Sequence, residues 1–450
     1  MSRASLRLAR TGRRPQSSHR VGKKSGSATR FKPARRQGVK KTNSKRPSRG
    51  EGTILRQLVE LIPAYLVPKL AREHGVDAQA RSFSPWSHVV TLLYAQLSHA
   101  LSLNDVCDGL RLWATPLRAL RGATPPSRNA LSHANKIRDC AMAEALFWRV
   151  LSHLQASFPQ FAQGNVRGLA WRFRRSIHVV DATVVQLVAS CLSWAEHNHR
   201  KAAAKVHLRL SLRSLLPGFV VVGSAVESEI TKVRQLCAAL QRGEIVLFDK
   251  GYHLLAHFWE LQQRGVYFVT RPKDSLRYRA VQHRACTHPR VLADEDILLA
   301  GRHSAHDYPA RLRRVKARVL VDGQEREMVF ISNNFTWSAW SIAELYRCRW
   351  QIEAFFKQIK QTLQLADFLG HSANAVQWQV WMALLVYVLL RFQAWCSHWP
   401  HSFCRLLTLL RAALWQRRDL AQLLRRYGTA PGDFAWLGPS TQSWLPGLAL

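Results

Sequence analysis

The sequence predicts a mixed α/β fold, with a sheet that is preceded and followed by helices. Three observations predict it. Residues 54–154 have apolar positions at helical spacing, residues 166–273 contain five short runs rich in β-branched and aromatic residues, and the chain after residue 337 is again helical. Consecutive strands that then alternate with helices are typical of a mixed sheet.

The first 52 residues differ from the rest of the chain. The first fifty contain 17 Lys or Arg and no acidic residue, within a total net charge of +38. Such a segment cannot bury enough apolar surface to fold alone, so we expect a disordered basic arm. A mitochondrial transit peptide remains an alternative interpretation, whereas the missing apolar region argues against a secretory signal.

Residues 53–165 are predicted to form a helical domain. One helix is expected to end at Pro63 and Pro68, a second to span residues 85–101, and a third to begin at Ser102 with a capping box. A fourth follows Pro125-Pro126-Ser127, and its polar residues either face DNA or form a solvated surface: Arg128, Asn129, His133 and Lys136.

The predicted strands are the runs SIHVVDATVVQL, AAKVHLRLSL, GFVVVGSAV, EIVLFDKGY and GVYFVTR. The stretches TKVRQLCAALQRG and HLLAHFWELQQRG predict helices before and after the fourth run. Residues 274–336 read as β-strands without clear helices, with Asp322-Gly323 as a hairpin turn. Residues 337–365 predict one long helix, and the apolar stretch 372–390 is too short to span a bilayer, so it predicts a buried helix.

Three carboxylates are the candidate catalytic residues. Asp181 and Asp249 each follow an apolar strand, and Glu353 lies on the long helix. A phenol and three cations fall within about 40° of Glu353 on a helical wheel: Tyr346, Arg349, Lys357 and Lys360. Taken separately, each Asp could simply cap a turn, and the helix could carry an ordinary surface ladder of ion pairs. Taken together, the carboxylates form an oxygen ligand set that suits Mg²⁺, the ion of phosphodiester displacement.

These residues resemble the motifs of the DDE transposases. Asp181 in DAT, Asp249 in DKGY and Glu353 resemble the three acidic positions, and the spacing Y-x2-R-x3-E-x6-K from Tyr346 to Lys360 is similar to the YREK signature of the insertion-sequence-four family of bacterial elements. The stretch KAAAKVHLRLSL resembles the strand that follows the first Asp, and the resemblance covers roughly residues 55–395.

The resemblance implies an RNase H-like mixed-sheet core with a β-strand insertion between the second Asp and the Glu. It also implies metal-dependent cut-and-paste transposition, in which the element ends are hydrolysed and the 3′-OH is transferred to target DNA. The metal would be Mg²⁺, with Mn²⁺ as a substitute, held by Asp181, Asp249 and Glu353. Tyr346, Arg349 and Lys360 would contact DNA phosphates. Five of the ten Lys outside the arm lie in these motif stretches and are DNA-binding candidates: Lys201, Lys205, Lys250, Lys357 and Lys360.

In the best-understood members of this family, an aromatic residue of the insertion stacks on a flipped base during a hairpin step. At the corresponding strand edge this chain has Glu327 and Met328, with Phe330, Phe335 and Trp337 as candidate substitutes. The predicted organisation is therefore a basic arm, a helical DNA-binding domain, the first part of the core, the insertion, the second part of the core with the Glu helix, and a helical C-terminal region: 1–52, 53–165, 166–273, 274–336, 337–395 and 396–450.

The basic charge predicts a polyanionic partner. We expect double-stranded DNA, as terminal inverted repeats and target, bound by a homodimer that brings two ends together. Two alternatives are a DNA-binding protein that has lost catalysis and a basic membrane-surface protein, although no amphipathic basic helix supports the latter. The eight cysteines lack a CxxC pair, which favours a reducing compartment, here a bacterial cytoplasm with the protein at the nucleoid.

Two histidine groups are weaker candidates for metal sites. His283, Cys286 and His288 lack a fourth ligand. His253 and His257 have the i,i+4 spacing of zinc ligands, but the Glu of a metalloprotease is missing, so we expect partly exposed helix residues.

Overall fold

The computed structural model describes residues 52–78, 82–163, 173, 175–187, 191, 196–197, 201–224, 229–321, 323–362 and 370–427. All but the last residue of the predicted arm lies outside these ranges, as does the chain after Tyr427, so the arm's disorder stays a prediction.

The chain begins with helices, as predicted. They are α1 (Ile54–Val59), α2 (Leu66–Glu73), α3 (Pro85–Ser98), α4 (Leu103–Leu112), α5 (Ala114–Arg118), α6 (Arg128–Ile137), α7 (Ala141–Ser157) and α8 (Pro159–Gln163). Ser84, Ser102 and Ser127 cap α3, α4 and α6 by accepting backbone N–H groups. The prediction that Pro68 ends a helix is wrong. Pro68 lies in the first turn of α2, where a backbone N–H would have no partner within the helix.

The core sheet has the RNase H-like order β4-β3-β1-β5-β6. Its strands are β1 (Ile177–Leu187), β3 (Lys201–Ser211), β4 (Pro217–Ser224), β5 (Ile245–Phe248) and β6 (Tyr267–Thr270), and the short β2 (Glu196–His197) pairs with the start of β3. The first three strands pair antiparallel, whereas β5 and β6 run parallel to β1. The predicted mixed sheet is confirmed. Its parallel members bring the carboxyl ends of β5 and β6 to one edge.

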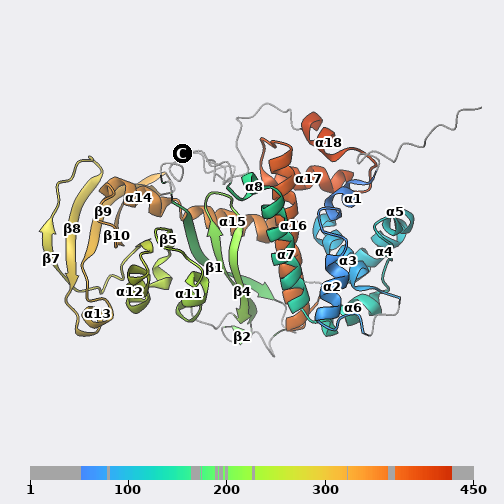
Figure 1. The fold of residues 1–450 in the computed structure, drawn as a ribbon, viewed down its shortest axis with the longest axis horizontal. Coiled ribbons are helices and arrows are strands. Elements are labelled where there is room, and N and C mark those ends of the chain that lie inside the picture. Colours follow the sequence, from blue (N-terminus) through green and yellow to red (C-terminus); the bar gives the residue numbers. More distant parts are fainter. Residues whose placement is uncertain are drawn as a thin grey trace, which may run out of the picture. The chain divides into compact units, whose positions relative to one another are not determined.

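Alternate residues of the central strands pack into two different cores. On β5, Ile245 and Leu247 face the core that includes α15 (Trp350–Thr362), whereas Val246 and Phe248 face the one that includes α11 (Glu229–Cys237) and α12 (Leu255–Gln263). The sheet is therefore covered by helices on both faces (Figure 1). This arrangement explains why β5 is apolar at every position.

The predicted insertion is an antiparallel extension of the same sheet. It contains β7 (Tyr278–His283), β8 (Val291–Leu299), α13 (Arg302–Asp307), β9 (Leu312–Val321) and β10 (Gln324–Ser332). The predicted hairpin is confirmed, because Val321 pairs with Gln324 and Gly323 has a φ of +76°. The prediction of no helices is wrong, since α13 lies between β8 and β9. The strand β10 returns to the core and pairs with β6.

The prediction of one long helix over residues 337–365 is also wrong. The structure has α14 (Ala339–Arg347) and then α15, separated by Cys348 and Arg349. At this break the Arg349 N–H bonds to the carbonyl of Tyr346, three residues back, and the turn tightens. Apolar residues continue at helical spacing across the break, and the sequence therefore gives no sign of it.

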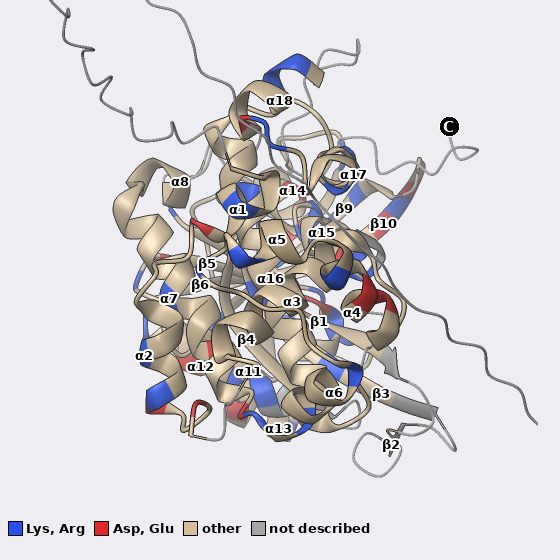
Figure 2. Ribbon diagram, turned by 90° about the vertical axis from the view of Figure 1, so that its right-hand side faces the viewer, with Lys and Arg blue, Asp and Glu red and all other residues tan. Residues whose placement is uncertain are grey.

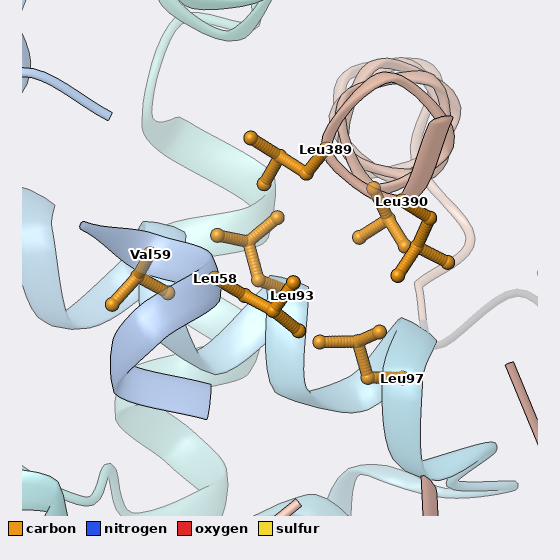
Figure 3. Close-up of a pocket in the computed structure, with 7 residues that line it drawn as sticks. Leu58, Val59, Leu93, Leu97, Leu389 and Leu390 are labelled. Atoms are coloured by element: carbon orange, nitrogen blue, oxygen red, sulfur yellow. The ribbon is translucent and has the colours of Figure 1, made fainter. Parts of the chain in front are cut away.

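The chain ends in α16 (Ala373–Cys396), α17 (Phe403–Ala413) and α18 (Leu420–Tyr427). The helix α16 is long and apolar enough to cross a membrane, but 83% of its most apolar window is buried inside the protein. It packs against α3, α6, α7 and α17. Figure 3 shows leucines of α16 facing the first helices across a small apolar pocket: Leu58 and Val59 from α1, Leu93 and Leu97 from α3, and Leu389 and Leu390 from α16. The predicted buried helix is confirmed.

Candidate active site

Two of the three predicted carboxylates meet at the end of the parallel strands. Val180 of β1 pairs with Phe248 of β5, so Asp181 and Asp249, the next residues, are neighbours. Asp181 accepts a hydrogen bond from the backbone N–H of Ala182 at 2.8 Å. Asp249 caps the short helix η3 (Lys250–Tyr252). Both side chains are therefore oriented by the backbone that follows them.

The third carboxylate reaches the first two through Arg349. Its Nη1 donates to Asp181 Oδ2 at 3.1 Å, its Nη2 donates to Glu353 Oε1 at 2.6 Å, and its Nε lies 3.7 Å from Asp249 Oδ1. Each carboxylate thus faces a different nitrogen of one guanidinium. The break between α14 and α15 places Arg349 directly before α15, about one turn before Glu353.

The cluster is buried on one side and open on the other. The Arg349 side chain is only 8% exposed and that of Asp181 15%, whereas Asp249 is 39% and Glu353 54% exposed. The buried Nε of Arg349 has no hydrogen-bond partner. A ligand from solvent would therefore approach along the side of Asp249 and Glu353.

Burial and like charges perturb the ionisation of the cluster. Burial raises the pKa of Asp181 to about 7, Asp249 and Glu353 add to the rise, and Arg349 opposes it. Burial lowers the pKa of Arg349, but Tyr346 and the three carboxylates outweigh it, so that pKa is raised overall. Burial also raises the pKa of Tyr346 to about 12. Tyr346 and Arg349 therefore enter the site as a neutral phenol and a fixed cation.

The donor set suits a divalent metal ion. Three carboxylates supply the oxygen ligands that hard cations prefer, and two of them are open to solvent. In the conformation described, the carboxylates surround the guanidinium, and the described residues contain no group of three acidic, His or Cys residues compact enough to hold a metal. The residues fit a metal by their chemistry, and Arg349 now provides the positive charge among them.

The other predicted site residues lie at different distances from this cluster. Tyr346 on α14 is buried and its hydroxyl lies 3.5 Å from Asp249 Oδ1. Lys357 is exposed on α15 and forms no ion pair with Glu353 in the described ranges. Lys360 is half-buried, which lowers its pKa. Lys250 pairs with Asp274 at 2.7 Å.

Lys205 of β3 is not brought to the carboxylates. Lys205 pairs with Val184, which points to the opposite face of β1 from Asp181. Lys201 begins β3, and its side chain lies outside the described part of the structure. Basic positions also recur on helices away from the site, α18 among them (Figure 2), so charge alone does not mark the active site.

The sequence did not point to Arg271. It follows β6 directly, at the edge where Asp249 follows β5, and it lies close enough to lower the pKa of Tyr346. A basic residue directly after the next parallel strand was the signal that could have identified it. Arg271 adds a cation in the neighbourhood of Tyr346.

The aromatic candidates of the insertion are placed clearly. Phe330 is fully buried and packs on Tyr346, with 5.1 Å between the ring centroids, so it cannot stack on a flipped base without leaving the core. Glu327 is paired with Lys316. Phe335 lies under the guanidinium of Arg284, and Trp337 packs against Tyr267. The structure removes Phe330 from the candidates for base stacking.

The histidine predictions need one correction. His253 and His257 are buried, 7% and 1% exposed, rather than partly exposed, and His253 precedes α12 instead of lying on it. Burial lowers the pKa of both. His288 stacks on Trp340, and within the described residues His283, Cys286 and His288 form no metal-holding group. On α6 the predicted polar face is exposed: Arg128, Asn129, His133 and Lys136.

Comparison with known proteins connects this geometry to a family. Residues 172–389 match the transposase DDE domain, and residues 51–120 match a domain of unknown function (DUF4372). The putative transposase y4zB of Sinorhizobium fredii is 30% identical over 257 residues, which are 56% of this chain and 70% of that protein. The chain belongs to the DDE transposase family.

Two further insertion-sequence transposases agree with this assignment. The probable transposase for insertion sequence element IS5377 of Geobacillus stearothermophilus is 28% identical over 49% of this chain and 57% of its own length. The transposase InsG for insertion sequence element IS4 of Escherichia coli is 24% identical over 42% of this chain and 43% of its own length. A piggyBac transposase in a synaptic complex with hairpin DNA aligns with a TM-score of 0.43 at 8% identity, over 84% of this chain and 82% of that one. The resemblance to the insertion-sequence-four transposases and the DNA transposase function are confirmed.

Proposed function

We propose that this transposase carries out cut-and-paste transposition of an insertion sequence, with Asp181, Asp249 and Glu353 as the ligands of Mg²⁺. The observation that carries the proposal is the convergence of the three carboxylates on one guanidinium at the carboxyl edge of the parallel strands. The family implies a divalent metal in general. Mg²⁺ is our choice among such ions because the ligand set is entirely oxygen, and Mn²⁺ would substitute for it.

The residues of this chain prepare the site for an anionic substrate. Three carboxylates and one guanidinium leave a formal charge of −2, which one divalent cation would balance. When bound, the ion would polarise the scissile phosphate and activate the attacking oxygen. The backbone of Ala182 and the turn after Asp249 orient two of the ligands in advance. Glu353, the most exposed ligand, stands where the DNA would enter.

The cations around the open side would hold the DNA backbone. Lys357 and Lys360 continue along α15 beyond Glu353, and Arg271 stands at the end of β6. Charge-assisted contacts from these side chains would neutralise phosphates next to the cleaved bond. Tyr346 would orient Asp249 from the buried side.

The wider assembly follows from the reaction. Two ends must be held together for a cut-and-paste product, so we propose a homodimer bound to both terminal inverted repeats and to target DNA. The exposed polar face of α6 is our candidate for reading the repeats. The reaction would take place in the bacterial cytoplasm, at the nucleoid.

The test is cleavage of a labelled DNA end by the purified protein with Mg²⁺, Mn²⁺ or EDTA. Asp249→Asn and Glu353→Gln should abolish strand cleavage and leave DNA binding largely intact, because each removes a metal ligand without changing the packing. Asp307→Asn, which alters a carboxylate of α13 that is 43% exposed, is the matched control and should cleave normally. Cleavage by either site variant at the wild-type rate would remove that residue from the triad. Binding without cleavage by the wild-type protein would favour a catalytically inactive DNA-binding protein.

A further inference from the structure

A second basic site lies at the opposite edge of the core sheet. It is a hollow of about 450 Å³ formed at the starts of β5 and β6 and by nearby loops. Its lining residues are Arg175, Arg242, Gly243, Gln262, Gly265, Tyr267 and Asn333. The volume lies within the range of ordinary ligand pockets. We call it the amino-edge pocket.

The amino-edge pocket is separated from the triad by the length of a strand. Gly243 precedes β5 and Asp249 follows it. At about 3.3 Å per residue, this interval corresponds to roughly 20 Å. The pocket and the carboxylates therefore open at opposite ends of the same strand, and a phosphate in the pocket would not be the one that is cleaved.

The positive charge of the pocket comes from its two arginines. Arg175 donates from Nη1 to the carbonyl of Gly243 at 3.0 Å, and its guanidinium lies 5.1 Å from the centroid of the Tyr267 ring. Neither Arg175 nor Arg242 forms an ion pair within the part of the chain that the structure describes. The carboxylate of Glu244, next to Gly243, is engaged by His178 at 3.4 Å and by the N–H of Gln241 at 2.8 Å. Two guanidinium groups against this one neighbouring carboxylate leave the hollow with a net positive charge.

The backbone makes room for these side chains. Gly243 and Gly265 have φ values of +87° and +70°, which disfavour any other residue. A Cβ at Gly243 would collide with the guanidinium of Arg175, and one at Gly265 would press against Arg242. Asn333 fixes the floor by accepting from the N–H of Phe268 and donating to the carbonyl of Val266. The pocket is thus built by several elements rather than by one mobile side chain.

We propose that the amino-edge pocket binds a backbone phosphate of a DNA segment other than the one engaged at the triad. Two guanidinium groups without a carboxylate partner among the described residues match a phosphodiester in charge and in hydrogen-bonding geometry. The Tyr267 ring is covered by Arg175 and packs on Trp337, so the pocket offers guanidinium groups to a phosphate rather than an aromatic face to a base. The inference rests on the proposed function, because a transposase must hold more than one DNA segment.

The test combines Arg175→Ala with Arg242→Ala and measures duplex binding across a series of salt concentrations. Loss of one phosphate contact should reduce the log–log salt slope by about 0.9 and weaken binding at low salt roughly ten-fold. Hydrolysis of an element end should persist, whereas strand transfer into target DNA should fall by a similar factor. A double variant with Lys at both positions should recover part of the affinity, because it keeps the charge.

The control removes two exposed arginines outside the pocket, Arg234 on α11 and Arg302 on α13, by substitution with Ala. It should leave the slope and strand transfer near wild type, and thermal unfolding should show that both double variants are folded. An unchanged slope in the pocket variant would overturn the inference. The inference would also be overturned if the pocket bound ATP or inorganic phosphate and this binding had no effect on the affinity for DNA. Failure of the wild-type protein to cleave DNA would instead refute the proposed function, and the slope comparison would still decide whether the pocket binds DNA.

Discussion

Arg349→Ala should destabilise the metal-free protein, because it leaves three carboxylates without their shared cation. The contact with Asp181 matters most, since that carboxylate is only 15% exposed. Breaking a buried ion pair costs about 3–5 kcal/mol, while the contacts with the more exposed Asp249 and Glu353 are worth about 1 kcal/mol or less each. Protonation of Asp181 would relieve part of the loss. We therefore expect the free energy of unfolding to fall by about 2–4 kcal/mol at neutral pH.

The assay is thermal or urea unfolding at neutral pH in EDTA, repeated with Mg²⁺. Mg²⁺ should stabilise Arg349→Ala more than the wild type, because the variant site has a formal charge of −3 instead of −2 and a bound ion stabilises the folded state by mass action. Arg349→Lys should fall between the two, since it keeps the charge but loses the planar fork.

Arg347→Ala is the matched control for this experiment. Arg347 lies two residues away, its side chain is 53% exposed, and its pairing with Glu344 at 3.7 Å should contribute less than about 1 kcal/mol. If Arg349→Ala and Arg347→Ala unfold alike in EDTA and respond alike to Mg²⁺, the guanidinium does not neutralise the triad. Arg349 would then serve only as the phosphate contact that the family signature implies.

Three further predictions concern the helices and the arm. Burial lowers the pKa of His88 to about 3 from its ordinary 6.5, so the stability that the neutral ring contributes should be lost as the pH falls below 6.5. In urea unfolding, the free energy of unfolding of the wild type should fall by about 2 kcal/mol more than that of His88→Gln between pH 7 and pH 5. Equal losses in the two proteins would contradict this. Leu390→Ala, in the apolar pocket of α16, should lower the free energy of unfolding by about 2–5 kcal/mol, whereas Leu112→Ala, at an 83% exposed position, should have little effect. Deleting residues 1–52 should weaken binding to all duplexes and flatten the salt dependence while discrimination of element ends survives; loss of discrimination alone would make the arm a base-reading element.

The sequence predicted the elements whose signals are local. Each of the five core strands is a short apolar run in the sequence. The structure has a strand at each of these five runs. The serine caps of three helices follow from one side chain and the backbone beside it. Asp181 and Asp249 could be expected to meet because each follows a buried strand, and the parallel pairing of β1 with β5 makes them neighbours.

Features that depend on distant packing could not be predicted in the same way. The contacts of Arg349 with Asp181 and Asp249 cross intervals of about 170 and 100 residues, and a helical wheel shows only the contact with Glu353. Burial of Phe330 depends on α14 covering β10. His253 and His257 were expected on one helix and partly exposed, whereas in the fold both are buried and their rings contact Phe258 and Phe248.

The route of the insertion has a consequence for how this protein can change over evolution. The chain leaves the core after β6 and returns on β10, which lies beside β6, with Ile331 opposite Thr270 and Ser332 opposite Val269. The departure and return points are thus adjacent, and the hydroxyl of Ser332 donates to the carbonyl of Phe268. A longer or shorter insertion, changed at its outer hairpins, would leave this junction in place. The insertion can therefore change in length without moving Asp181 or Asp249, and its outer turns are suitable positions for adding a new recognition module to a preserved core.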